Sequence, residues 1–302
     1  MQPNRVIGVD VGGTKILAGI LHRDGSVERR HERPTPTASQ DELLAALERA
    51  VDELFDGDIA AVAFGMPSRI DQASGRVEGS VNIPIAGVPL RDLMSERFGV
   101  PVGIENDASA ATLAEFHVGA GREAKTLVML TLGTGCGGGI VIDGELYRGW
   151  AELGHMVVVV DGLPCQGTCT GRGHLESYVS GHAATRIARE TFGPEVEAHQ
   201  LVSLARGGDE RAREAIARIG RYLGAGIGGL VNIFQPEIVV VGGGFAAGAG
   251  DFVLDPARVV ARTEALAPAG ERVRIVPAEL ENDAGMIGAA MVAFEAVDAA
   301  SS

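Results

Sequence analysis

The sequence contains few of the features that mark secreted, membrane-bound or nucleic-acid-binding proteins. Cysteine occurs only three times in 302 residues. No uninterrupted apolar run reaches the roughly 18 residues that a membrane-spanning helix needs. The opening residues, MQPNRVIGVD, lack the charged start and the apolar stretch of a secretory signal. We therefore expect a cytoplasmic protein without a membrane partner.

Positive charge is scarce as well. Lys and Arg total 26 against 40 Asp and Glu, which gives a formal net charge of −14. Nucleic acids are bound by clustered Lys and Arg, so a nucleic-acid partner is not expected. The net negative charge also repels ATP at long range, so any nucleotide would be held by magnesium and by local backbone dipoles. The hydrophobic content of 46% is enough for two sizeable cores.

Glycine, by contrast, is abundant, with 43 residues, and the most informative glycines stand near the start. Residues 5–21 contain two apolar runs joined by Gly12 and Gly13, which predicts a β-hairpin. A glycine turn leaves backbone N–H groups free to approach a phosphate, and Asp10 beside it is placed to hold magnesium or its waters. The pattern GxxxxGK[ST] is missing, so the turn is not a P-loop. A purely structural turn fits these residues equally well.

Two further glycine loops follow apolar strands, at 127–147 and at 237–248. One such loop is a weak signal. Three loops, each after an apolar strand, predict a nucleotide held between two related halves of the chain. An ordinary strand-to-helix turn stays open as an alternative for any single glycine of the third loop.

Apolar spacing between these loops predicts alternating strands and helices. A capping box at Ser39–Glu42 is expected to start a helix whose apolar face includes Leu43, Leu47 and Val51. The further elements that we expect are a strand at 58–68, a helix at 89–99, a strand ending at 106–107, and helices at 108–117 and 209–232.

Five segments in this order resemble the ROK family of sugar kinases, whose name covers repressors, open reading frames and kinases. They are VDVGGTK, GIENDASAATLAE, LTLGTGCGGGIV, the ELGH element at 152–155, and VVVGGG. The resemblance implies an α/β protein with the actin-like ATPase (ribonuclease H-like) fold, in which two α/β domains surround a central cleft. We expect a smaller N-terminal domain at 1–120, with the C-terminal helix packing back on it. A larger C-terminal domain with a zinc loop is expected at 121–302, after a crossing at 119–123.

The resemblance assigns ATP, with Mg²⁺, to the three glycine loops. The residues concerned are Asp10, Gly12, Gly13, Thr14, Lys15, Gly133, Thr134, Gly135, Gly242, Gly243 and Gly244. A DNA-binding helix-turn-helix would need about 60–80 residues before the first hairpin. Asp10 leaves no room for one, so we expect a kinase and not a repressor.

Asp107 is the candidate catalytic base. It follows a buried-type strand and opens a helix, where ligand sites of α/β sheets collect. Spacing alone favours a structural role, because an Asp in a first helical turn complements the helix dipole and Asn106 is a good N-cap. The E-N-D pattern of the family reverses this preference: its Asp takes the proton of the sugar hydroxyl, and its Asn binds the sugar.

Glu152, His155 and Glu176 form a second polar group. Carboxylates distinguish sugar hydroxyls by bidentate hydrogen bonding, and the resemblance implies that these three residues contact the hexose. Gly65 and Asn82 resemble further sugar contacts. Glu176 could instead be a solvated carboxylate at a helix start. The stretch NIPIAGVPL lacks the aromatic residue that glucokinases of the family often carry there, which leaves the identity of the sugar open.

The metal loop departs from the family pattern of His, nine residues, Cys-x-Cys, four residues, Cys. Here it reads His155-x9-Cys165-x3-Cys169-x4-His174. Two Cys and two His still satisfy tetrahedral, structural Zn²⁺. Free thiols or a disulfide between the two cysteines are the alternatives, the disulfide being disfavoured in a reducing cytosol. Cys136 lies in the second glycine loop and is expected to be a small residue under a tight turn, not a ligand.

These observations predict an ATP-dependent hexose kinase, with glucose as the expected substrate and glucose 6-phosphate as product. A kinase for fructose, an N-acetylated amino sugar or another hexose is the first alternative. A catalytically silent sugar sensor is the second, and Asp10, Asp107 and three glycine loops speak against it. Inorganic polyphosphate is a less suitable donor, because the third loop suits adenosine. A homodimer or homotetramer is expected.

Overall fold

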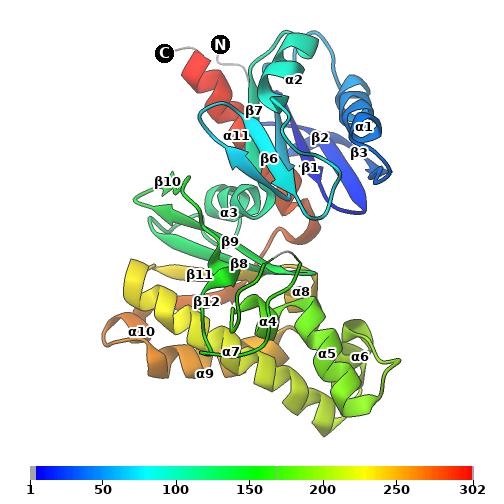
Figure 1. The fold of residues 1–302 in the computed structure, drawn as a ribbon. Helices are drawn as coiled ribbons and strands as arrows, with labels where there is room; N and C mark the ends of the chain where they lie inside the picture. Colours follow the sequence, from blue (N-terminus) through cyan, green and yellow to red (C-terminus); the bar gives the residue numbers. More distant parts are fainter. Residues whose placement is uncertain (1–4, 168, 301–302) are drawn as a thin grey trace. The chain divides into compact units, whose positions relative to one another are not determined.

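The computed structural model describes residues 5–167 and 169–300, and these form two compact units (Figure 1). Unit 1 extends to Val118 and takes in the residues from Asn282 onward, whereas unit 2 is Gly119–Glu281. Unit 2 thus begins at the first residue of the segment 119–123, where the crossing between domains is expected. The C-terminal helix belongs to unit 1, because it follows Asn282. Among the described residues, no helix has both the length and the apolar character that a membrane span requires.

Unit 1 is built on a five-stranded sheet with the order β3-β2-β1-β4-β7. The first three strands, β1 (Val6–Val11), β2 (Lys15–Leu21) and β3 (Val27–Pro34), form an antiparallel meander, so the hairpin predicted for residues 5–21 is confirmed. Strands β4 (Val62–Met66) and β7 (Val102–Asn106) run parallel to β1. The expected strand at 58–68 is thus shorter, because Asp56 and Asp58 take part in a turn before it.

Gly8 in β1 allows a helix to pack closely against one face of this sheet. Ile7 and Val9 of β1 belong to a core shared with α1 (Gln40–Asp52) and α2 (Leu90–Phe98). Gly8 faces the other way, and a Cβ there would collide with the Met286 carbonyl of α11 (Ala284–Ala300). Helix α11 therefore lies directly on β1, beside α3 (Asp107–His117). The central strands are consequently covered on both faces, whereas the edge strand β3 is largely exposed.

The start of α1 is simpler than the sequence predicts. Ser39 Oγ accepts the backbone N–H of Glu42 at 3.2 Å, as an N-cap should. The reciprocal bond of a capping box, from Ser39 N–H to the Glu42 carboxylate, is not among the hydrogen bonds of the described residues. Between β4 and α2 the chain forms a separate hairpin of β5 (Ser68–Asp71) and β6 (Arg76–Ser80).

Unit 2 repeats the same sheet topology, with the order β10-β9-β8-β11-β12. Strands β8 (Leu127–Leu132), β9 (Cys136–Ile142) and β10 (Glu145–Leu146) form the antiparallel part. Strands β11 (Ile238–Gly242) and β12 (Arg274–Pro277) are parallel to β8. The two related halves predicted from the glycine loops are therefore visible in the topology.

The helices of unit 2 form one large core against this sheet. They are α4 (Glu176–Val179), α5 (Gly181–Phe192), α6 (Ala198–Arg206), α7 (Glu210–Phe234), α8 (Gly244–Ala249), α9 (Asp251–Glu264) and α10 (Ala269–Arg272), with the 3-10 turn η1 (Leu153–His155). A second 3-10 turn, η2 (Glu281–Asp283), lies at the boundary between the units. The long helix expected at 209–232 is α7. It packs along α9 (Figure 1), and a Cβ at Gly224 would lie 2.5 Å from the Ala257 carbonyl oxygen.

Candidate active site and metal centre

The polar residues of unit 1 gather at the carboxyl ends of its parallel strands. In the sheet register Asp10 lies beside Gly65, and Met66 lies beside Asn106. Asp107 follows directly as the first residue of α3. Ligand sites of open α/β sheets form at such strand ends. The fold therefore brings together four of the residues that the sequence analysis assigns to catalysis, sugar and magnesium.

Asn106 caps helix α3. Its Oδ1 accepts the backbone N–H groups of Ala108 at 3.0 Å and Ser109 at 3.2 Å, so the predicted N-cap is confirmed. The side chain of Asp107 also accepts the N–H of Ala108, at 2.8 Å. Because Asn106 already satisfies the helix start, Asp107 is not required as the cap.

Asp10 lies in an unusual electrostatic environment. Burial and, to a smaller extent, the negative charge of Asp107 raise the pKa of its carboxyl to about 7, although Lys15 acts in the opposite direction. A Cβ at Gly285 would lie 2.5 Å from Asp10 Cγ, so the first turn of α11 packs on this carboxylate. Two neighbouring carboxylates in a low-dielectric site favour either a shared proton or a bound cation.

The first glycine turn is held in shape by its own backbone and by Thr35. The Gly12 N–H donates to the Lys15 carbonyl at 2.8 Å, and Thr35 Oγ1 donates to the Gly12 carbonyl at 2.7 Å. Lys15 Nζ forms an exposed ion pair with Glu32 at 3.0 Å. A Cβ at Gly13 would lie 3.6 Å from the Asn82 carbonyl oxygen. Asn82, a predicted sugar contact, thus lies next to the predicted phosphate turn.

Glu105 is a residue that the sequence analysis overlooked. Glu105 is 3% exposed, and its carboxylate accepts hydrogen bonds from Gln72 Nε2 at 2.9 Å and from the Asn106 N–H at 3.0 Å. Gln72 lies in the turn between β5 and β6. Glu105 therefore ties this hairpin to the strand end that carries Asn106. A glutamate in an apolar strand was the available signal, since a buried carboxylate needs hydrogen-bond donors.

In unit 2, Glu176 is fixed on the second glycine turn. Its Oε2 accepts the Cys136 N–H at 2.8 Å, and a Cβ at Gly135 would collide with this carboxylate. The turn itself is closed by a bond from Gly133 N–H to the Gly135 carbonyl at 3.0 Å. Glycine at 135 thus makes room for a predicted sugar ligand, a link that no spacing in the sequence reveals. Cys136 is buried, and burial raises the pKa of its thiol.

The third glycine loop packs against the end of β8. Gly243 has a φ of 89° and precedes α8. A Cβ there would lie 2.5 Å from the Leu132 carbonyl carbon. Because Leu132 directly precedes Gly133, the second and third glycine loops lie side by side within unit 2. Thr134, the remaining residue of the second loop, accepts the His182 N–H through its carbonyl at 3.4 Å.

The four expected metal ligands come together in unit 2. His155, Cys165, Cys169 and His174 each offer a donor atom, and these atoms all lie within 4.8 Å of one another. Cys169 Sγ is 3.7 Å from His174 Nδ1. A bond from Cys165 N–H to the Gly171 carbonyl at 2.9 Å closes the loop.

The chemistry of this cluster fits a zinc ion. His155 Nδ1 is buried without a hydrogen-bond partner among the described residues, and it lies 3.6 Å from Glu152 Oε2. Burial raises the pKa of the Cys165 thiol, which a bound cation would reverse. Gly167 has a φ of 61° and provides the bend in the widened Cys-x3-Cys segment.

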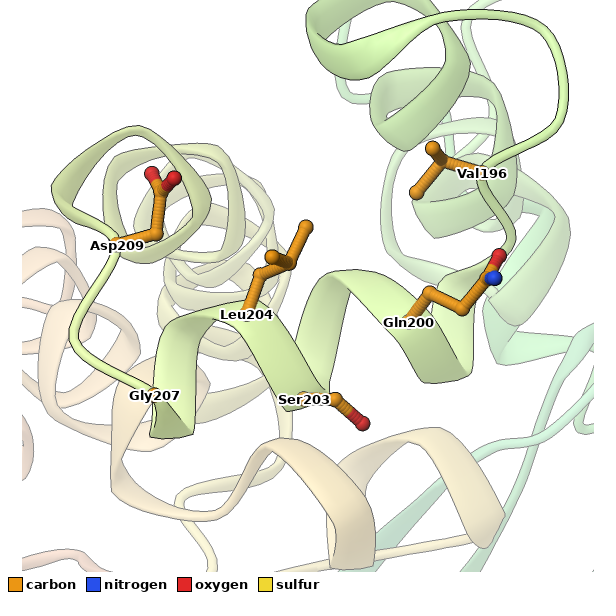
Figure 2. A pocket seen from close by; sticks show the side chains of 6 residues that line it. All are labelled: Val196, Gln200, Ser203, Leu204, Gly207 and Asp209. Carbon is orange, nitrogen blue, oxygen red and sulfur yellow. The ribbon is translucent and has the colours of Figure 1, made fainter.

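A separate cavity of about 480 Å³ lies over α6 and the start of α7 (Figure 2). It is lined by Val196, Gln200, Ser203, Leu204, Gly207 and Asp209. None of these belongs to the predicted site residues, so the glycine turns and polar clusters described above are distinct from it.

Comparisons with known proteins agree with the motif pattern. The model of the ROK family matches residues 6–296. The chain is similar to a glucokinase of Streptomyces coelicolor, with 35% identity over 96% of the chain and 97% of the relative. It is also similar to an N-acetyl-D-glucosamine kinase of Pectobacterium carotovorum, with 32% identity over 94% of the chain and 97% of the relative.

A solved structure shares the fold. The ROK family glucokinase from Streptomyces griseus, in complex with glucose and AMPPNP, superposes with a TM-score of 0.83 and is 34% identical. The similarity covers 96% of the chain and 99% of that structure.

Proposed function

The chain belongs to the ROK family, and we propose that it transfers the γ-phosphoryl group of ATP to glucose, giving glucose 6-phosphate and ADP. The fold is the actin-like ATPase fold of these sugar kinases, and the enzyme is an ATP-dependent hexose kinase. One observation supports the chemistry most directly. Asp10, Asn106 and Asp107 meet at the strand ends of unit 1, where a base, a sugar ligand and a cation ligand are needed together.

Asp107 is the base in this proposal. Its carboxylate accepts the proton of the attacking sugar hydroxyl while that oxygen bonds to the γ-phosphorus and ADP leaves. Phosphoryl transfer depends mainly on positioning and on charge stabilisation. Helix α3 supplies the positioning, because its cap is provided by Asn106 and leaves the base at a fixed place on the first turn.

Nucleotide and sugar are assigned to the residues named from the sequence. Backbone N–H groups of the three glycine loops contact the phosphates and adenosine, and Asp10 holds Mg²⁺ or its waters. Magnesium, when bound, neutralises phosphate charge. Gly65, Asn82, Asn106, Glu152, His155 and Glu176 contact the hexose in this proposal. The bond between Glu176 and Cys136 N–H then links sugar recognition to the second phosphate turn.

The four-residue cluster is proposed to hold a structural Zn²⁺. Two thiolates and two imidazoles match its usual tetrahedral donor set. Such an ion would fix the ring of His155 through one nitrogen and leave the other for a sugar hydroxyl. We also propose a homodimer or homotetramer that works in the cytoplasm, where ATP is supplied.

A coupled ADP-release assay over a hexose panel tests this proposal. Glucose should give the highest kcat/KM among glucose, fructose, mannose and N-acetylglucosamine. A preference for N-acetylglucosamine would favour the alternative that the Pectobacterium carotovorum relative suggests. Binding of ATP without turnover on any sugar would support the silent sensor and overturn the kinase.

A further inference from the structure

A groove lined by arginines runs along the free edge of the sheet in unit 2. Strand β12 is the edge strand, and α9 and α10 flank it. The groove encloses about 340 Å³, and Arg258, Arg262, Arg272 and Arg274 line it together with Glu271 and Ile275. Four arginines around one cavity stand out in a chain whose net charge is −14.

Most of this positive charge has no partner among the described residues. Arg258 is the exception, because it forms ion pairs with Asp251 at 3.0 Å and Asp255 at 2.7 Å. Arg262, Arg272 and Arg274 are exposed, and within residues 5–167 and 169–300 their side chains make no hydrogen bond or ion pair. Glu271 is the one acidic residue of the lining, so the groove keeps an excess of positive charge.

The edge strand adds a backbone donor. Arg274 N–H donates to the Glu237 carbonyl, and Ala278 N–H donates to the Val241 carbonyl. By the alternation of a parallel ladder, the N–H and carbonyl of Ile275 face away from β11. Its carbonyl accepts Arg258 Nε at 3.0 Å. Its N–H has no partner in the described part of the chain, and Ile275 is one of the residues that line the groove.

The groove is distinct from the proposed nucleotide site. Arg274 is paired with Ile238 at the start of β11, whereas Gly242 ends that strand. Gly242 is four residues beyond Ile238 along β11, a distance of roughly 13 Å. The groove is therefore near the amino ends of the parallel strands, and the glycine loops are at their carboxyl ends.

We propose that this groove is a binding site for a small phosphate-bearing dianion, separate from the kinase reaction. Arginine guanidinium groups bind phosphate bidentately. The unpaired Ile275 N–H supplies a neutral donor of the kind that phosphate sites use. Addition of an acidic peptide as a further strand is disfavoured, because Arg258 already occupies the Ile275 carbonyl.

Thermal unfolding of the full-length, zinc-retaining protein tests the site. Inorganic phosphate should raise Tm relative to chloride at equal ionic strength, and the rise should persist when MgADP saturates the nucleotide site. Arg262→Ala combined with Arg274→Ala should weaken phosphate binding by at least about tenfold, since each removes a charge-assisted hydrogen bond. Glu271→Gln should strengthen it, because it removes the one acidic side chain of the lining.

Arg49→Ala is the matched control, because Arg49 is an exposed arginine of α1 in unit 1. It should leave phosphate binding unchanged. A hexose 6-phosphate titrated alongside inorganic phosphate distinguishes a phosphomonoester from free phosphate as the ligand. Equal Tm shifts in the wild type and the double variant would overturn the proposal. So would tight binding of a glutamate-rich peptide that phosphate does not displace. Kinase activity of the wild type is scored separately, so failure of this site leaves the proposed function intact.

Discussion

At the scale of single residues, Asp107 has two possible roles that substitution can separate. We expect Asp107→Asn to fold normally and to lower kcat by roughly 10²–10⁴-fold, the range for a positioned proton acceptor. The amide still forms hydrogen bonds, so the KM for glucose should change much less. Steady-state kinetics and thermal unfolding measure both quantities.

Asp41→Asn is the matched control, because Asp41 also lies in a first helical turn, that of α1. It removes a similar helix-dipole interaction, worth about 0.3–1 kcal/mol, and should leave kcat unchanged. Near wild-type kcat in Asp107→Asn would remove Asp107 from the mechanism.

Asp10 should make the stability of the metal-free protein depend on pH. Its folded-state pKa is about 7, above the ordinary value of 3.8, so the native state binds the proton more tightly than the unfolded chain. Stability is therefore lost as pH rises from about 4 to about 7. The Asp10→Asn variant has no carboxyl at this position and does not lose stability in this way. Its free energy of unfolding at pH 8 should exceed that of the wild type by up to about 4 kcal/mol. Urea unfolding at pH 5 and pH 8 without Mg²⁺ measures the difference, which should be less than half as large at the lower pH, about 1.7 kcal/mol.

The same variant should have almost no kinase activity, because the proposed role of Asp10 is to hold Mg²⁺ and a neutral amide binds this cation much more weakly than a carboxylate does. Asp107→Asn should reduce the pH dependence of wild-type stability, since the negative charge of Asp107 contributes to the raised pKa of Asp10. A stability difference between Asp10→Asn and the wild type that does not change with pH would contradict this account.

Residues within sequence motifs can be predicted more easily than the residues that hold them in place by hydrogen bonds. Asn106 and Asp107 could be placed because a strand-to-helix junction has a local pattern. Glu105 and the bond from Cys136 N–H to Glu176 could not, because each joins residues distant in the chain. Such contacts depend on tertiary packing, which single-sequence spacing does not encode.

At the scale of elements, hairpins and long amphipathic helices were predictable, and their mutual packing was not. The apolar stripe of α7 identified the helix, but not that Gly220, Gly224 and Gly228 fit against α9. The strand expected at 58–68 was too long, because apolar content alone does not show where pairing begins. The metal loop is predictable in part. Its spacing indicates four ligands, and the structure brings all four together.

The metal loop yields a prediction of its own. The purified protein should carry about one zinc per chain, bound by His155, Cys165, Cys169 and His174. Removal of the metal should raise the KM for sugar at least as clearly as it lowers Tm, since the proposed ion would orient His155. Cys169→Ser should have the same effects. Elemental analysis, kinetics and thermal unfolding measure these quantities.

Cys136→Ser is the control for thiol loss, because Cys136 lies outside the cluster, at the start of β9. Its metal content should equal that of the wild type. Fully active enzyme without zinc would show that Cys165 and Cys169 are ordinary loop thiols.

At the scale of the whole molecule, the residues proposed for each substrate are divided between the two units. Asp10 and Asp107 belong to unit 1, whereas Glu152 and Gly242–Gly244 belong to unit 2. If both substrates need groups from both units, binding of one should favour binding of the other. The coupling must be reciprocal, so glucose should tighten nucleotide binding by the factor by which nucleotide tightens glucose binding.

Trp150 offers a direct measurement of this coupling. It is the only tryptophan of the chain, is 80% exposed, and lies two residues before Glu152. Glucose bound at Glu152 should therefore change its fluorescence, which gives dissociation constants with and without a non-hydrolysable ATP analogue. We expect glucose affinity to rise about 5–150-fold with the analogue, the usual range of coupling between sites. Small-angle scattering should show a more compact protein with glucose. Identical affinities in both titrations, with unchanged scattering, would mean that glucose and the nucleotide bind independently. A substrate-induced closing movement of the two units would then have no part in catalysis.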